Sequence, residues 1–203
     1  MAVFCTEFTP SRSFAERFPD TRVLGFTGFA GAGKTTAAKI LAAHVPGTRI
    51  MSFAEPLRAV CKQVFPLVAA EYFDDPALKN TVIPGYETEG LTGRKILQHI
   101  GTEGFRALDQ DVWIRLADYR IFEAALEGAK LIVFDDVRFE NEAALISKYG
   151  PVVLVDRPGL TAGAHASERG ILAIRAAGHV INDASLEELS ARVLAGYAAT
   201  YKE

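Results

Sequence analysis

The sequence has few cysteines and no long apolar run. Its 203 residues include two cysteines, Cys5 and Cys61, which fit neither a disulfide framework nor a metal-ligand spacing. We therefore interpret both as reduced thiols. The longest apolar runs, such as Leu131–Phe134 and Val152–Val155, are far shorter than the roughly 20 residues that span a bilayer.

The sequence also lacks an excess of basic charge. A formal net charge of −3 at pH 7 argues against stable binding to nucleic acid or to an anionic membrane. Charged residues such as Glu7, Arg12 and Asp20 interrupt any apolar signal-peptide core. We expect a cytoplasmic protein, and the sequence leaves open whether it forms a homodimer.

What the chain has is a globular composition and a regular alternation of elements. Hydrophobic residues make up 49% and charged residues 23%, as in ordinary folded domains. Residues 1–21 show no clear period and are interpreted as an N-terminal extension with one short helix near 13–18. Thereafter the pattern predicts strands at 22–27, 49–53, 130–135, 151–155 and 179–181, and helices at 34–44, 55–65, 94–99, 111–126, 140–148, 172–177 and 185–202. Gly101 and Gly104 are expected to separate two of these helices. Such alternation favours an α/β fold with a parallel sheet covered by helices on both faces.

The strongest chemical signal is the segment Gly28–Thr35, which matches G-x-x-x-x-G-K-[ST]. It follows an apolar strand and opens a helix, as phosphate binding by backbone N–H groups requires. A chain of this length contains the bare pattern by chance roughly once in a hundred. The pattern predicts a nucleoside triphosphate site in which Lys34 bridges the β- and γ-phosphates and the Thr35 hydroxyl binds Mg²⁺. The residues expected to bind the cofactor ATP are Gly28, Ala30, Gly31, Ala32, Gly33, Lys34, Thr35 and Thr36.

A metal-bound triphosphate usually needs a carboxylate at the end of another strand. Asp135 and Asp136 follow the apolar run Leu131–Phe134. Because successive strand side chains point to opposite faces, we expect one of the two to serve the metal and the other to cap a turn.

Phosphoryl transfer also requires positive charge around the moving group, and arginine forks suit phosphate. Five arginines near strand ends and loops are the candidates: Arg58, Arg94, Arg106, Arg138 and Arg157. Solvated surface charges are the expectation for the others considered: Arg12, Arg17, Arg115, Arg120 and Arg192.

The second half carries a family resemblance. Arg94-x-x-Leu97-Gln98-x-x-Gly101-Thr102-Glu103-x-x-Arg106, followed by Asp111-x-Trp113-Ile114, resembles the monophosphate-binding region of bacteriophage deoxynucleoside monophosphate kinases. Further segments resemble the later motifs of that family: Asp136–Glu142, Asp156–Gly159, His165–Glu168 and Ile181–Asp183. The resemblance runs from about Arg22 to the last residue.

The resemblance implies a P-loop NTPase fold of the nucleoside-monophosphate-kinase type, a three-layer sandwich around a five-stranded parallel sheet of order 2-3-1-4-5. Residues 22–203 would form one domain with a monophosphate-binding insert at about 54–127 and a lid-like segment at about 156–177. The implied reaction is ATP + dNMP → ADP + dNDP, for DNA precursor supply in the host cytoplasm if a phage encodes the chain.

The resemblance also implies roles for individual residues. Lys34, Arg138 and Arg157 would be catalytic, Asn182 would lie near adenine, and the metal would be held by Thr35 and by Asp136, which matches the D-V-R-F motif. The acceptor would be bound by Phe53, Arg58, Arg94, Gln98, Thr102, Glu103, Arg106, Trp113 and Asp136.

Two other functions remain open at this point. Dephospho-coenzyme A kinases show a weaker resemblance and share the core. A P-loop ATPase without kinase activity is the third reading, although the chain lacks an N-K-x-D segment and is small and acidic for a DNA motor. The accepted base is not fixed by the sequence. Phe53, Phe139 and Trp113 are the candidate walls that would exclude a ribose.

Overall fold

The computed structural model describes residues 12–161 and 170–201. By its internal contacts the chain divides into two compact units, one made of Met1–Ser52 with Ala117–Glu203 and the other of Phe53–Leu116. Most of the second unit lies within the range of about 54–127 that the resemblance implies for the monophosphate-binding insert.

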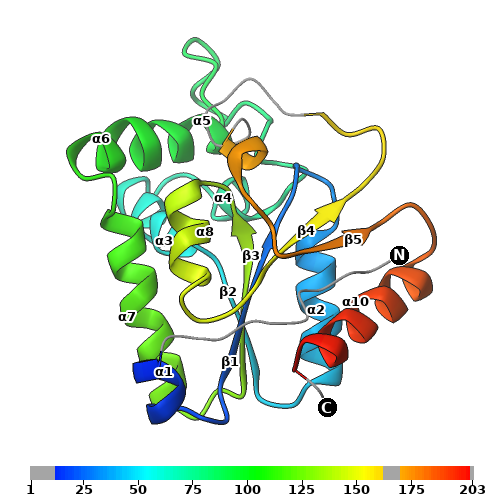
Figure 1. Ribbon diagram of the computed structural model, residues 1–203. Helices are drawn as coiled ribbons and strands as arrows, with labels where there is room; N and C mark the ends of the chain where they lie inside the picture. The colour runs from blue at the N-terminus through cyan, green and yellow to red at the C-terminus, as the bar shows by residue number, and fades with distance from the viewer. Residues whose placement is uncertain (1–11, 162–169, 202–203) are drawn as a thin grey trace. The chain divides into compact units, whose positions relative to one another are not determined.

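The first unit contains five parallel strands, which Figure 1 shows as one twisted sheet. They are β1 (Arg22–Thr27), β2 (Thr48–Met51), β3 (Leu131–Val137), β4 (Val152–Asp156) and β5 (Gly178–Ile181). Their order is β2-β3-β1-β4-β5, so the predicted sheet order is confirmed. β1, β3 and β4 consist largely of buried residues, because helices cover both faces of a parallel sheet.

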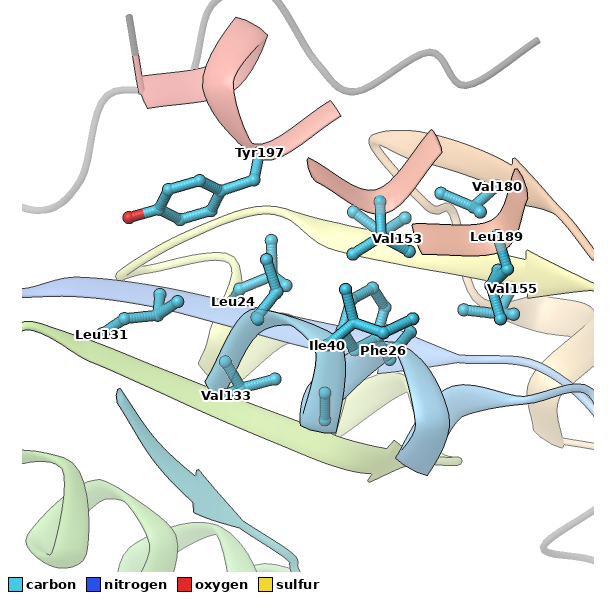
Figure 2. Close-up of a cluster of buried hydrophobic side chains, with 14 of the residues drawn as sticks. Leu24, Phe26, Ile40, Leu131, Val133, Val153, Val155, Val180, Leu189 and Tyr197 are labelled. Carbon is cyan, nitrogen blue, oxygen red and sulfur yellow. The ribbon is translucent and has the colours of Figure 1, made fainter. Parts of the chain in front are cut away.

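One face of the sheet packs against α2 (Lys34–His44) and α10 (Leu186–Tyr201), which lie together on that side (Figure 1). Alternate strand residues supply this core, as the period of two in a strand requires. Figure 2 shows Leu24 and Phe26 of β1 beside Val153 and Val155 of β4, with Leu189 of α10 above them. The packing holds α2, and therefore the loop that precedes it, firmly on the sheet.

The opposite face packs against α8 (Glu140–Ile146). A Cβ atom at Gly25 would lie 3.0 Å from side-chain atoms of both Ile146 and Val137. This close packing leaves little room for a side chain in the middle of β1.

The short helix α1 (Arg12–Arg17) anchors an aromatic cluster in the first unit. Phe14 is 1% exposed, and its ring centroid lies 5.3 Å from that of Phe122 and 4.8 Å from that of Tyr149. Phe122 belongs to α7 (Val112–Leu126), which lies beside α1 in Figure 1. The described part of the predicted extension is therefore packed into this unit.

The second unit is helical: α3 (Glu55–Val64), α4 (Glu71–Asp74), α5 (Gly93–Gln98), the π-helix η1 (His99–Phe105), α6 (Arg106–Leu108) and the beginning of α7. The expectation that Gly101 and Gly104 interrupt the helix is wrong, because helical backbone continues from Gly93 to Leu108. A Cβ atom at Gly101 would lie 2.4 Å from Leu57 Cδ2 of α3. Gly101 therefore permits close packing of η1 against α3 rather than a break. Cys61 of α3 is a free, buried thiol, and burial raises its pKa.

The remaining differences concern element ends. β2 ends at Met51 rather than at 53, and β3 continues to Val137 rather than ending at 135. A 3₁₀-helix, η2, forms at Gly170–Ala173 instead of the helix predicted at 172–177. None of the helices within residues 12–161 and 170–201 is long and apolar enough to cross a membrane.

Candidate active site

The glycine-rich loop, Gly28–Thr35, joins β1 to α2 in the first unit. Gly28, Gly31 and Gly33 have φ angles of 138°, 80° and 104°, a region that side chains with a Cβ atom rarely occupy. A Cβ atom at Gly28 would lie 2.2 Å from the Val155 carbonyl oxygen. These glycines are therefore required by the loop conformation itself, and α2 begins directly behind the loop at Lys34.

Lys34 is buried within this loop, at 7% exposure. Its ammonium group donates to the carbonyl oxygens of Gly28 at 2.6 Å and Phe29 at 2.8 Å. A buried ammonium at the start of a helix, surrounded by loop backbone, is the arrangement that anionic phosphate binding calls for.

The two adjacent carboxylates have separate partners. The Thr35 hydroxyl donates to Asp135 Oδ2 at 2.7 Å, whereas Asp136 Oδ2 accepts from the Ser52 hydroxyl at 2.6 Å. The pairing of β1 with β3 shifts here: Gly25 pairs with Phe134, but Thr27 pairs with Val137. β3 therefore contains one extra residue at the doublet, a bulge of the kind that redirects side chains. This geometry favours Asp135 over Asp136 for the metal role, which reverses the preference drawn from the resemblance.

The oxygen atoms at Thr35 and Asp135 suit Mg²⁺, which binds hard oxygen ligands and keeps several positions for water and phosphate. In the described ranges, no group of three or more His, Cys, Asp or Glu side chains could hold a metal ion. Two protein oxygen atoms, from a hydroxyl and a carboxylate, therefore fit a metal ion that binds together with a nucleotide better than a metal ion that the protein alone coordinates.

Asn182, expected near adenine, contacts the loop itself. Its side-chain amide donates to the Ala32 carbonyl oxygen at 2.8 Å, and its backbone N–H donates to the Asp156 carbonyl oxygen at 2.7 Å. The structure thus places Asn182 against the backbone of the loop, between the ends of β4 and β5.

Arg138 lies in the turn between β3 and α8. The buried Glu142 carboxylate accepts from the backbone N–H of Arg138 at 2.7 Å and of Phe139 at 3.1 Å. This positioning role of Glu142 was not predicted from the sequence, although an acidic residue at the third position of a helix is a recognised signal. Arg157 follows β4 and is exposed. The segment His165–Glu168 lies outside the described residues.

Two arginines expected to be solvated are held by hydrogen bonds instead. Arg120 donates to the Ser52 carbonyl oxygen at 3.2 Å. Arg192 donates to the Ile181 carbonyl oxygen at 2.5 Å, and its side chain is 20% exposed. The expectation was wrong because the partner of each arginine is distant in the sequence: Ser52 lies 68 positions from Arg120, and Ile181 lies 11 positions from Arg192, across a turn.

The second unit holds most of the residues that the resemblance assigns to the acceptor. Arg94 begins this series on α5, and its Nε atom is buried with no hydrogen-bond partner among the described residues. A buried guanidinium nitrogen without a partner is costly unless a ligand satisfies it. Arg94 is therefore the member of the set that fits an anionic ligand most directly.

The other members have protein partners. Arg58 lies 3.6 Å from Asp74, Arg106 donates to the Gln110 carbonyl oxygen at 3.3 Å, and Glu103 pairs with His99 at 2.5 Å. Gln98 ends α5, Thr102 lies on η1, and Phe53 is buried at the start of the unit.

Trp113 is a buried brace within the second unit. Its indole N–H donates to the Gly101 carbonyl oxygen at 3.2 Å, and Phe105 packs edge-on against it with ring centroids 5.3 Å apart. These contacts support a role for Trp113 in the core of the second unit.

Two findings relate the chain to known protein sequences. A model of the deoxynucleotide monophosphate kinase family matches residues 73–193. A protein of Acanthamoeba polyphaga mimivirus, named "Putative deoxynucleotide monophosphate kinase", is 31% identical over 184 residues, which cover 85% of this chain and 94% of the viral protein.

Among solved structures, a Thermus thermophilus protein is 20% identical, covers 88% of this chain and 97% of its own, and has a TM-score of 0.48. An unliganded sugar kinase from a Janibacter species is 16% identical, covers 89% of this chain and 98% of its own, and has a TM-score of 0.49. At these identities and TM-scores neither likeness bears on the activity of the chain.

Proposed function

The chain belongs to the deoxynucleotide monophosphate kinase family, and we propose that it transfers the γ-phosphoryl group of ATP to a deoxynucleoside monophosphate. An oxygen of the acceptor phosphate forms a bond to the γ-phosphorus while the bond to the β-bridging oxygen breaks, which yields ADP and a deoxynucleoside diphosphate. The observation that carries the proposal is the glycine-rich loop with Lys34 buried inside it and Thr35 hydrogen-bonded to Asp135.

The loop residues bind the triphosphate in this proposal. Gly28, Ala30, Gly31, Ala32 and Gly33 present backbone N–H groups, together with those of Lys34, Thr35 and Thr36 at the start of α2. The Lys34 ammonium exchanges its two loop carbonyls for phosphate oxygens and stabilises the charge that develops during transfer.

Mg²⁺, when bound, neutralises phosphate charge and orients the β- and γ-phosphates. Thr35 and Asp135 would hold it, since their oxygen atoms already lie 2.7 Å apart. Asp136, tied to Ser52, would hold the end of β3 in place.

Arginines supply the remaining positive charge. We assign the acceptor phosphate to Arg94, on the evidence of its buried Nε atom, and the transferring group to Arg138 and Arg157. Phe53, Arg58, Gln98, Thr102, Glu103, Arg106 and Trp113 complete the proposed acceptor set, with Trp113 acting through the fold of η1. The physiological role would be the supply of DNA precursors.

The test is ADP release measured with every ribo- and deoxynucleoside monophosphate, with dephospho-coenzyme A and DNA as further arms. We expect stimulation by deoxynucleoside monophosphates. A wall without a partner for the 2′-OH would disfavour ribonucleotides about 5- to 150-fold in kcat/KM. Comparing dGMP with GMP and dTMP with UMP decides this point. Stimulation only by dephospho-coenzyme A or by DNA would replace the proposal with one of the two other functions.

A further inference from the structure

The loop between β5 and α10 contacts the glycine-rich loop through one side chain. Asn182 Nδ2 donates to the Ala32 carbonyl oxygen at 2.8 Å, and a Cβ atom on Gly33 would lie 2.6 Å from the same nitrogen. The amide therefore fills the space beside the backbone that precedes α2. Any rotation of Asn182 would leave both the Ala32 carbonyl and the space beside Gly33 without support.

Arg192 holds the chain on both sides of Asn182. One guanidinium nitrogen donates to the Ile181 carbonyl oxygen at 2.5 Å and to Asp183 Oδ1 at 2.7 Å. The other nitrogen donates to Glu188 Oε1 at 2.8 Å. The hydrogen bond from Arg192 also lowers the pKa of Asp183, so this carboxylate stays ionised and paired.

The helix that carries Arg192 is itself fixed. Leu189, one turn earlier on α10, is 3% exposed in the core that α10 shares with α2. A Cβ atom at Gly33 would lie 3.8 Å from Leu189 Cδ2. A well-packed helix thus positions Arg192 so that one of its guanidinium nitrogens donates to both residues that flank Asn182, Ile181 and Asp183.

We propose that Arg192 is a positioning residue for triphosphate binding: it fixes residues 181 and 183, so that Asn182 holds the Ala32–Gly33 backbone in its phosphate-binding conformation. The inference rests on the proposed ATP site. It assigns Arg192 no contact with the nucleotide, only an effect that passes through Asn182. Since the loop binds phosphate with backbone N–H groups, a small displacement of the loop weakens several hydrogen bonds at once.

The experiment is a double-mutant cycle on ATP affinity in the full chain. The variants are Arg192→Met, Asn182→Ala and the double variant, and the measurement is the Kd of MgATP by isothermal titration calorimetry without acceptor. We expect each single variant to raise the Kd about 5- to 30-fold. The double variant should be no weaker than the weaker single variant. Glu188→Gln is the matched control, because it removes the charge of one partner of Arg192 and leaves the contacts to Ile181 and Asp183; its Kd should stay within about twofold of the wild type.

The outcomes separate this inference from the proposed function. No MgATP binding by the wild-type protein would overturn the proposed function. Tight binding by the wild type and an unchanged Kd in Arg192→Met would overturn only the role of Arg192. Additive losses in the cycle would show that Arg192 does not act through Asn182. If thermal melting shows that Arg192→Met is unfolded, Arg192→Lys replaces it in the cycle. Lysine keeps the positive charge but lacks the planar guanidinium group that donates to several partners at once.

Discussion

The two carboxylates at the end of β3 should respond differently to the same neutral substitution. Asp135→Asn removes the negative charge of the carboxylate whose Oδ2 atom accepts from the Thr35 hydroxyl at 2.7 Å. It leaves an amide, which binds Mg²⁺ more weakly than a carboxylate. In Asp136→Asn, by contrast, the amide oxygen can still accept from the Ser52 hydroxyl, now 2.6 Å from Asp136.

The magnitude follows from the loss of a carboxylate at the metal, because an amide oxygen could still accept from the Thr35 hydroxyl. Removing a residue that supports a metal site costs about 10- to 100-fold in metal affinity or activity. We expect Asp135→Asn to lower kcat/KM for MgATP by this factor and to raise the Mg²⁺ concentration needed for half-maximal activity. Asp136→Asn should lose less than about fivefold, because a neutral hydrogen bond replaces a charged one without leaving the serine unpaired.

The assay is ADP release as a function of MgATP at saturating acceptor, repeated over a range of Mg²⁺ concentrations, with thermal melting of each variant as the folding control. A larger loss in Asp136→Asn, with both variants folded, would refute the reasoning from the hydrogen bonds and return the metal to Asp136. An unchanged Mg²⁺ dependence in Asp135→Asn would remove Asp135 from the metal site.

Three further substitutions test other parts of the molecule. Lys34→Ala should lower kcat by at least about 10²-fold while circular dichroism shows an intact fold, and near-normal turnover would contradict the role of Lys34. Arg94→Ala should mainly raise the KM of the acceptor and Arg138→Ala should mainly lower kcat, because only Arg138 is assigned to charge that grows in the transition state. The measurement is steady-state kinetics with varied acceptor, and an unchanged KM in Arg94→Ala would remove Arg94 from the acceptor site. Phe14→Ala should lower the free energy of unfolding by about 3 kcal/mol in urea titrations, since Phe14 is 1% exposed among three aromatic rings. A loss below about 1 kcal/mol would mean that α1 contributes little to stability.

The three central strands, β1, β3 and β4, could be predicted from the sequence because they are short, largely apolar runs of the kind expected in a sheet buried on both faces. The order of the strands came from the family resemblance. The glycine-rich loop could also be predicted from the sequence, because its residue spacing is typical of a loop that follows a strand and precedes a helix. Gly101 was misjudged for a tertiary reason. Its role is set by Leu57, which a local pattern does not reveal, and the same residue type that ends helices elsewhere here allows two of them to pack closely.

Arg192 and Asp135 show what else lies beyond local patterns. The partners of Arg192 include a backbone carbonyl eleven positions away, across a turn. The contact of Asp135 with Thr35 occurs beside a bulge that exists only in the pairing of β1 with β3. In neither case do the residue type and its immediate neighbours distinguish a solvated surface charge from a side chain that makes specific contacts.

The bulge also explains how two consecutive acidic residues acquire different partners at one end of the sheet. In a regular strand, neighbouring side chains point to opposite faces, and one member of a doublet would be directed away from the edge where β1 and β2 end. The extra residue in β3 lets Asp135 contact Thr35, at the start of α2 after β1, while Asp136 contacts Ser52, one residue after the end of β2. Arg120 donates to the carbonyl oxygen of that same serine. The doublet therefore ties the segments that leave both neighbouring strands to β3, and the carboxylate suited to a metal is the one that faces the glycine-rich loop.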